Sequence, residues 1–325
     1  MKLHRTAVAI ILLAAFLVLC IWRSQSTALP RVLEAWDNQN GQTDAGYGPP
    51  VHLADLEDRS INESSGIAAS RRNAKLLWTH NDSGDGPFIY AFDRQGKHRG
   101  VWRIAGASAI DWEDMAVGPG PAPGQSYIYI GDIGDNSRQR EEVIVYRVIE
   151  PLITSEDSSS TKSNPRNTRA ADVFRLKYPD GKHDAETLMV HPSTGDLYIV
   201  TKVMRAAAGV YKLKGPLQNA KETTLTHVGD IRLPNLMVGF ITGGDISPDG
   251  KRVVLCDYLA GSELILADTK AVDFDAIWKR QPVPVNLGSR KQGEAICYRS
   301  DGTALLLTSE GMPCPLIEIP RRRQD

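Results

Sequence analysis

The sequence repeats one pattern five times: an acidic residue, a short apolar run, a turn, a second apolar run and a polar loop. The turns SPDGKR (247–252) and RSDGT (299–303) place Asp-Gly between apolar runs, which predicts β-hairpins. The acidic residues of successive copies are 50, 73, 59 and 49 residues apart, and they are Glu63, Glu113, Glu186, Asp245 and Glu294. Recurrence at about 50 residues is typical of blades repeated around an axis.

Each copy is preceded by a further apolar run, so that each repeat supplies four strands. The sequence therefore predicts an all-β chain and a five-bladed β-propeller over residues 51–325, in which the run at 51–57 completes the last blade. Two alternatives stay open. A sixth blade fits into the 73-residue gap, and a β-sandwich or an open stack of hairpins uses the same short strands.

Segments outside the repeats have other compositions. A basic start, MKLHR, and an uninterrupted apolar run at 7–22 predict a signal peptide or membrane anchor over residues 1–28. Either one exports the rest of the chain, to the periplasm, the extracellular space or the outer face of a membrane. Residues 29–50 have the composition of a tether, and the polar insertion at 154–169 predicts a disordered surface loop. The strongest helix pattern is short, at 271–280.

The charge balance restricts the partners. With 38 Lys and Arg against 39 Asp and Glu, the net charge of −1 argues against nucleic acid, because a phosphate backbone requires a basic surface. The expected partner is a small or anionic ligand, or a protein. A membrane is a partner only through an uncleaved N-terminal segment.

The repeated acidic residues predict a metal site. In a propeller, the start of the innermost strand and the loop after the second strand lie at the same end of the channel, because neighbouring strands are antiparallel. Carboxylates gathered there repel one another unless a cation neutralises them, and flexible oxygen ligands suit Ca²⁺ better than Mg²⁺. The predicted metal ligands are Glu63, Glu113, Asp114, Asp132, Asp135, Glu186, Asp245 and Glu294. The alternative is that these carboxylates cap strand amides or pair with Lys and Arg.

Loops of the same repeats supply further candidates. HNDSGDG (80–86) and GDIGDN (131–136) carry the spaced Asp and Asn that can surround calcium, although ordinary turns use the same residues. His80 is a candidate general acid or base, with Glu113 as its catalytic partner. Asn81 and Asp82, together with the cations Lys202 and Arg205, are the predicted ligand-binding residues.

Between residues 63 and 148 the chain carries the motifs SGIAAS, LWTHNDSGD, DWEDMAVG, IYIGDIGDN and VYRV. In these motifs it resembles a family of exported bacterial β-propellers. It is more loosely similar to the phytase-like propellers, in which calcium ions bridge the enzyme and a substrate phosphate. That resemblance implies metal binding by Glu113, Asp114, Asp132 and Asp135, and phosphate contacts from Lys202 and Arg205. Glu113, Glu186 and Glu294 also resemble the central positions of calcium-activated nucleotidases.

Two functions are consistent with these features. One is a calcium-stabilised propeller that binds a ligand at its mouth, and the other is a calcium-dependent phosphoester or phosphoanhydride hydrolase. Because propellers serve both purposes, the fold class does not decide between them.

Overall fold

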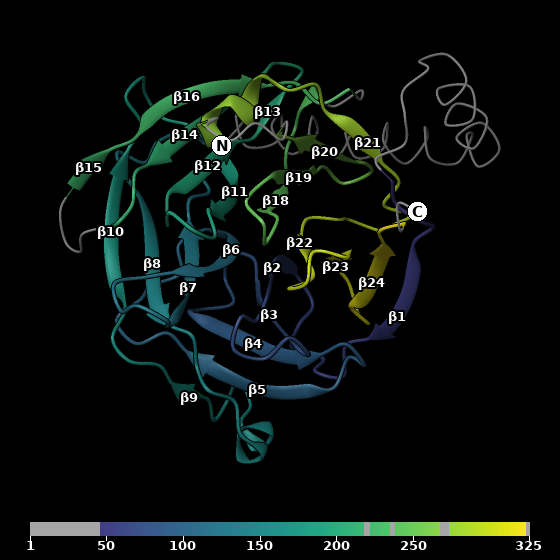
Figure 1. Cartoon of the computed structure of the whole chain (residues 1–325). Coiled ribbons are helices and arrows are strands. Elements are labelled where there is room, and N and C mark those ends of the chain that lie inside the picture. Colours follow the sequence, from purple (N-terminus) through teal and green to yellow (C-terminus); the bar gives the residue numbers. More distant parts are fainter. Residues whose placement is uncertain (1–45, 218–221, 235–237, 267–272, 323–325) are drawn as a thin grey trace, which may run out of the picture. The chain divides into compact units, whose positions relative to one another are not determined.

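The computed structural model describes residues 46–217, 222–234, 238–266 and 273–322. Five β-sheets stand around a central axis and form a five-bladed β-propeller (Figure 1). The predicted fold class and the count of five blades are confirmed, whereas the sandwich, the open stack and the sixth blade are wrong. The predicted signal or anchor segment (1–28) and residues 29–45 of the predicted tether (29–50) lie outside the described residues. Within the described ranges, no helix is long and apolar enough to cross a membrane.

Each blade is a sheet whose strands follow one another outward from the axis. The first contains β2 (Ser64–Ala69), β3 (Leu76–Asn81), β4 (Phe88–Asp93) and β5 (His98–Arg103). The second contains β6 (Trp112–Pro119), β7 (Ser126–Asp132), β8 (Val143–Ile149) and β10 (Asp172–Lys177), with β15 (Glu222–Thr224) at its edge. The third contains β11 (Ala185–Val190), β12 (Leu197–Thr201), β14 (Ala208–Leu213) and β16 (Thr226–Ile231). The fourth contains β18 (Gly243–Ile246), β19 (Arg252–Cys256), β20 (Gly261–Ile265) and β21 (Val283–Val285).

The last blade joins both ends of the described chain. It contains β22 (Ile296–Tyr298), β23 (Ala304–Leu307), β24 (Pro315–Pro320) and, outermost, β1 (Val51–Asp55). β1 pairs antiparallel with β24, and just outside this pair the Arg322 amide donates to the Gly46 carbonyl over 2.7 Å. The predicted closure of the ring by the first strand is therefore confirmed.

Glycines lie in the turns of three hairpins, two of which, at 247–252 and 299–303, are predicted above. Gly195, Gly250 and Gly302 have φ values of 70°, 69° and 70°, in the left-handed region where a side chain is strained. They connect β11 to β12, β18 to β19 and β22 to β23. These turns place the first two strands of each of these blades side by side in a fixed register.

The polar insertion is ordered, so the expectation of a disordered loop was wrong. It forms the 3₁₀ helix η1 (Ser155–Ser159) and the short strand β9 (Arg166–Asn167), which extends the first blade by pairing parallel with β5. Ser160 fixes it further, because its hydroxyl accepts from the buried Val101 amide over 2.8 Å. The helix predicted at 271–280 is the 3₁₀ helix η2 (Phe274–Lys279), and residues 271 and 272 lie outside the described ranges. Two short strands, β13 (Val203–Met204) and β17 (Val238–Gly239), pair with each other.

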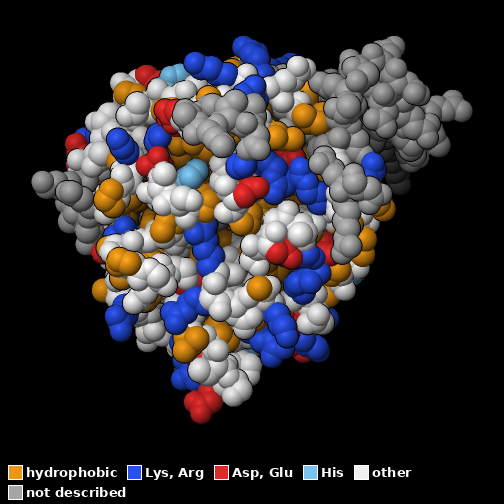
Figure 2. All heavy atoms as spheres, viewed as in Figure 1, with side chains coloured by type: hydrophobic (Ala, Val, Ile, Leu, Met, Phe, Trp, Pro, Cys, Tyr) orange, Lys and Arg blue, Asp and Glu red, His pale blue; other side chains and the backbone are white. Residues whose placement is uncertain are grey.

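The hydrophobic core lies between the blades. Five clusters of buried side chains fill the five interfaces between neighbouring sheets. Large aromatic residues such as Trp78 and Tyr198 are fully buried in them. The outer surface in the view of Figure 2 mixes Lys and Arg with acidic and polar side chains, and hydrophobic side chains are scattered among them. Close packing at every interface holds the innermost strands, and the side chains at their ends, in fixed positions.

Candidate metal centre at the mouth of the channel

The loops expected to converge at one end of the channel do so. The Asp82 amide after β3 donates to the carbonyl of Glu63 before β2, over 2.8 Å. In the third blade the Lys202 amide after β12 donates to the carbonyl of Asp184 before β11, over 2.9 Å. The residues before each innermost strand therefore lie beside the residues after the second strand, and we call this end of the propeller the mouth.

β-Bulges place side chains at the mouth. The pairing of β6 with β7 shifts at Glu113, and that of β11 with β12 shifts at Glu186. The same irregularity in the first blade falls at Ser65, two residues after Glu63. A bulged residue is released from the strand ladder and redirected, which explains why Glu113 and Glu186 leave the regular alternation of the strand.

Three carboxylates form a group that can hold a metal ion. Asp82, Asp111 and Glu113 each contribute one carboxylate oxygen, and these three oxygens lie within 4.8 Å of one another. Glu113 is 5% exposed, and the two aspartates are half-buried. At this separation two ionised carboxylates repel each other by about 3 kcal/mol at an effective dielectric constant of about 20. A bound cation removes this cost.

The geometry around the three carboxylates fits a cation. No described residue donates a hydrogen bond to the carboxylate of Asp111 or Glu113. Gly134 lies against both, since a Cβ atom there would come 2.1 Å from Glu113 Oε1 and 2.4 Å from Asp111 Oδ2. The absence of a side chain at position 134 thus leaves the two carboxylates room to converge. An all-oxygen set of this kind suits a hard divalent ion.

Further carboxyl groups surround these three. Burial and its neighbours, Glu186 first, raise the pKa of Glu113 well above its ordinary value. Burial raises the pKa of Glu186 to about 8, although Lys202 opposes this. Burial and the nearby Glu294 raise the pKa of Glu310 to about 8. We call this cluster the acidic mouth; its members are Asp82, Asp111, Glu113, Glu186, Glu294 and Glu310.

Lys202 brings a positive charge into the acidic mouth. Its ammonium group pairs with Glu186 Oε1 and lies 4.7 Å from the ring centre of Phe240 and 5.8 Å from that of Tyr258. Glu186 Oε2 is buried and has no hydrogen-bond partner among the described residues. Lys202 is therefore engaged by a carboxylate and two aromatic rings, while Glu186 keeps one oxygen available for another donor or a cation.

Two of the predicted metal ligands bind strand amides instead. Asp114 accepts from its own neighbour Met115 over 2.8 Å and from Leu188 of the next blade over 2.9 Å. Asp245 does the same with Ile246 and Tyr298, over 2.8 and 2.9 Å. Each of these carboxylates therefore connects the innermost strands of two adjacent blades. For these two residues the alternative given in the sequence analysis, capping of strand amides, is the one observed. Burial raises the pKa of Asp245 to about 7.

Two other predicted ligands organise the loop after β7. Asp132 pairs with Arg140 over 2.8 Å and accepts from the amides of Ile110 and Asp111. Asp135 accepts from the amides of Gln139 and Arg140, each over 2.8 Å. Asp132 thereby positions Asp111, a member of the three-carboxylate group.

The remaining predicted residues have varied surroundings. His80 is fully buried, its ring packs edge-on against Trp112, and burial lowers its pKa. Asn81 binds the backbone of Ser60, Asn62 and Glu63, so it anchors the loop that enters the first blade. Glu63 and Arg205 are exposed at the mouth end.

The sequence predictions omitted members of the site. Asp111 was not among the predicted ligands, although it stands two residues before Glu113 in DWED. Glu310 follows β23 in SEG (309–311) and occupies the position in the last blade that Lys202 occupies in the third. The repeat of acidic residues does not select it, because that repeat marks the start of the innermost strand. The loop after the second strand, compared across blades, was the signal that could have found it.

Comparison of the sequence with models of known protein families and with curated proteins found no match.

Proposed function

We propose that this protein is a calcium-binding β-propeller that binds a ligand at its acidic mouth. The observation that carries the proposal is the group formed by Asp82, Asp111 and Glu113, whose oxygens lie within 4.8 Å of one another. Calcium suits this group better than magnesium does, because side chains from loops and a bulge offer irregular oxygen geometry.

The ligand approaches from the solvent side of this group. Asp82 and Asp111 are half-buried, so an ion held there keeps a face toward the outside. A small or anionic ligand would complete the coordination of the ion. Lys202 is paired with Glu186, so an anionic group would be held mainly through the ion. The resemblance to exported bacterial propellers adds the proposal that the chain acts outside the cytoplasm.

A second candidate is calcium-dependent hydrolysis of a phosphoester or phosphoanhydride, as in the phytase-like propellers. It is favoured by the solvent-facing side of the three-carboxylate group, where a phosphate oxygen can reach an ion. Asp82, Asp111 and Glu113 would hold the ion, and the bound ion would supply polarisation of the phosphoryl group. Lys202 stands near Glu113 and would add positive charge close to the phosphate.

Unfolding with and without calcium tests the proposal. Urea titrations of the wild type in chelator and in excess calcium should differ by about 2.7 kcal/mol at 100 times the dissociation constant. Glu113→Gln should lose most of this difference, whereas the exposed Glu156→Gln should keep it. Equal calcium effects in wild type and Glu113→Gln, or none in either, would contradict the proposal.

The same proteins separate the two candidate functions. Phosphate release is measured from phytate, a nucleoside triphosphate and p-nitrophenyl phosphate, with calcium and with chelator. Calcium-dependent turnover that Glu113→Gln abolishes supports hydrolysis, and calcium binding without turnover supports the ligand-binding function.

A further inference from the structure

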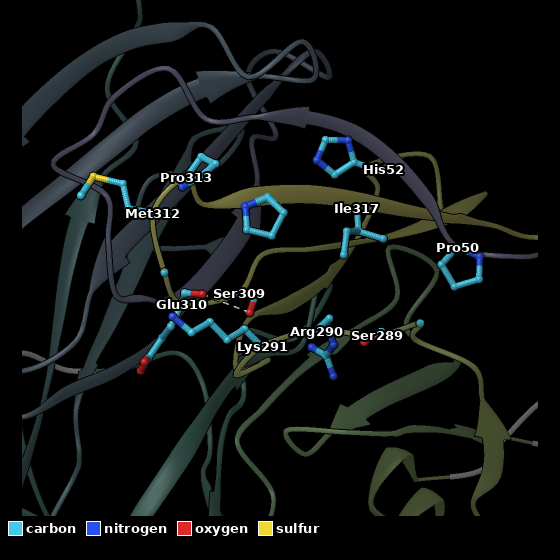
Figure 3. Close-up of a pocket in the computed structure, with 13 residues that line it drawn as sticks. Pro50, His52, Ser289, Arg290, Lys291, Ser309, Glu310, Met312, Pro313 and Ile317 are labelled. Carbon is cyan, nitrogen blue, oxygen red and sulfur yellow. Dashed lines mark hydrogen bonds between the residues drawn. The ribbon is translucent and has the colours of Figure 1, made fainter. Parts of the chain in front are cut away.

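A cavity in the last blade lies beside the acidic mouth. It has a volume of about 520 Å³ and lies between the segment 288–291, the loop 309–315 and the start of β1 (Figure 3). Cavities that hold small molecules in proteins have volumes of about 300–1,000 Å³. Glu310 belongs to both the acidic mouth and the lining of the cavity, but none of the three carboxylates of the proposed metal site lines it. The cavity is therefore separate from that metal site.

A buried cation in the lining lacks acceptors for most of its N–H groups. Arg290 lines the cavity and is 9% exposed. Its Nη2 atom donates to the Asp257 carbonyl over 2.9 Å, whereas Nε and Nη1 are buried and have no hydrogen-bond partner among the described residues. A guanidinium group stays charged in proteins, and a buried charge without acceptors is costly. An anionic oxygen that reached these nitrogens would remove this cost.

Neighbouring backbone fixes the position of Arg290. A Cβ atom at position 293 would come 2.1 Å from both Cζ and Nη1 of Arg290, so the guanidinium group lies directly against Gly293. The Asp257 carboxylate does not line the cavity, although its charge acts on Arg290, and its Oδ1 atom accepts from the amides of Leu259 and Ala260 over 2.7 and 2.6 Å. Because Nε and Nη1 are covered, a ligand reaches them by displacing part of the lining, and such side-chain adjustments on binding are common.

The lining carries more positive than negative charge. Lys291 is exposed, lines the cavity, and has no ion pair or hydrogen bond with any residue that the structure describes. His52 also lines the cavity and pairs with Asp55 over 2.9 Å. The acidic side chain in the lining is Glu310, whose carboxyl group is hydrogen-bonded to that of Glu294. Two cations against one carboxyl group suit a singly charged anion better than a doubly charged one.

The wall opposite the cations is apolar. In Figure 3, Arg290 and Lys291 lie on one side of the cavity, and Pro313 and Ile317 lie on the opposite side. Met312 also lines it and is 59% exposed, so an apolar group of a ligand would cover hydrophobic surface that now faces water. The cavity thus favours a molecule with one charged end and an apolar body.

We propose that this cavity binds a small amphipathic carboxylic acid, with its carboxylate at Arg290 and Lys291 and its apolar body against the opposite wall. A carboxylate and a guanidinium group form short, charge-assisted hydrogen bonds, which would satisfy the nitrogens that lack acceptors. The inference goes beyond the proposed function, because this ligand is held by side chains of the last blade and not through the metal ion.

Four probes separate the charge from the apolar contact in calorimetric titrations of the full chain. Octanoate has both features, octanol has only the apolar chain, acetate has only the carboxylate, and octyl phosphate has the same chain with a phosphate. Octanoate should bind about tenfold or more tightly than octanol and acetate. Equal binding of octanoate and octanol would overturn the anionic part, and equal binding of octanoate and acetate would overturn the apolar part. Tighter binding of octyl phosphate than of octanoate would overturn the choice of a carboxylate.

Variants of the lining locate the site. Arg290→Gln should weaken octanoate binding by about tenfold or more, because it removes the buried charge. Since this change can also disturb folding, the exposed Lys291→Gln and Met312→Ser give a second test, and each should weaken binding by about threefold. The exposed Arg280→Gln and Leu152→Ser are the matched controls and should change nothing. If Lys291→Gln and Met312→Ser bind octanoate as the controls do, the site is wrong.

The metal ion is tested separately. Octanoate should bind the wild type equally in calcium and in chelator, because no residue of the three-carboxylate group lines the cavity. Loss of octanoate binding in chelator would show that the acid binds to the ion and would overturn the inference. Absence of a calcium effect on unfolding, by contrast, contradicts the proposed function and leaves this inference standing.

Discussion

The acidic mouth should make the stability of the calcium-free protein fall as the pH rises. Burial raises the pKa of Glu186 from its ordinary 4.5 to about 8, so the folded protein holds a proton there that the unfolded chain has released. Between these two pH values the folded state binds more protons, and the free energy of unfolding therefore decreases with increasing pH. One extra proton corresponds to about 1.4 kcal/mol for each pH unit.

For Glu186 alone the expected loss between pH 6 and pH 8 is about 2 kcal/mol, because the group is still mostly protonated over that range. The side chain is only 6% exposed, so solvent screens the effect little. Calcium should flatten the dependence, since a nearby cation favours the ionised carboxyl groups of the mouth.

Urea titrations followed by tryptophan fluorescence, at pH 6, 7 and 8, measure this effect in metal-free buffer with chelator and again with calcium. Glu186→Gln should reduce the slope in chelator, because glutamine does not titrate and can still accept from Lys202. The exposed Glu156→Gln is the matched control. A free energy of unfolding that stays constant or rises with pH in chelator, or a slope unchanged by Glu186→Gln, would refute the reasoning.

Two further predictions address other contacts. Gly134→Ala should weaken calcium binding by about tenfold or more, because a Cβ atom 2.1 Å from Glu113 Oε1 displaces this ligand, and the position of a metal ligand tolerates a displacement of only about 0.5 Å. The affinity is measured by calorimetry, with Gly131→Ala as the control. An affinity equal to that of the wild type would contradict the assigned ligands. Tyr47→Phe should lower the free energy of unfolding by about 2 kcal/mol, because it removes the 2.8 Å hydrogen bond to the buried carboxylate of Glu263; a urea midpoint equal to that of the wild type would show that this contact does not stabilise the ring.

The fold could be predicted because its determinants are local and repeated. Asp-Gly turns such as those at Gly250 and Gly302 fix hairpins, and four runs per repeat fix the number of strands in a blade. The ordered insertion could not be predicted, because its polar composition resembles that of a disordered loop. What orders it is contact with a distant strand, through Ser160 and Val101.

The site was harder to predict, because a shift of one residue in the strand register moves a side chain to the other face of the sheet. Glu63 was matched with Glu113, but the bulge equivalent to Glu113 is at Ser65. Asp245 lies opposite Val254, two pairs beyond the mouth-end pair of Gly243 with Cys256, and there it bonds strand amides. Acidic residues recur in the sequence for two physical reasons, ion binding and amide capping, and only the three-dimensional register distinguishes them.

Because β1 pairs with β24, both ends of the described chain lie in the same blade, and the fold does not require the chain to begin and end there. Residues 46 and 322 are already joined by a backbone hydrogen bond. A short linker between them, with new termini cut into a surface connection such as that between β8 and β10, would preserve every strand pair and every residue of the mouth. The architecture is in this sense cyclic, and circular permutation would give the same ring from a different starting point.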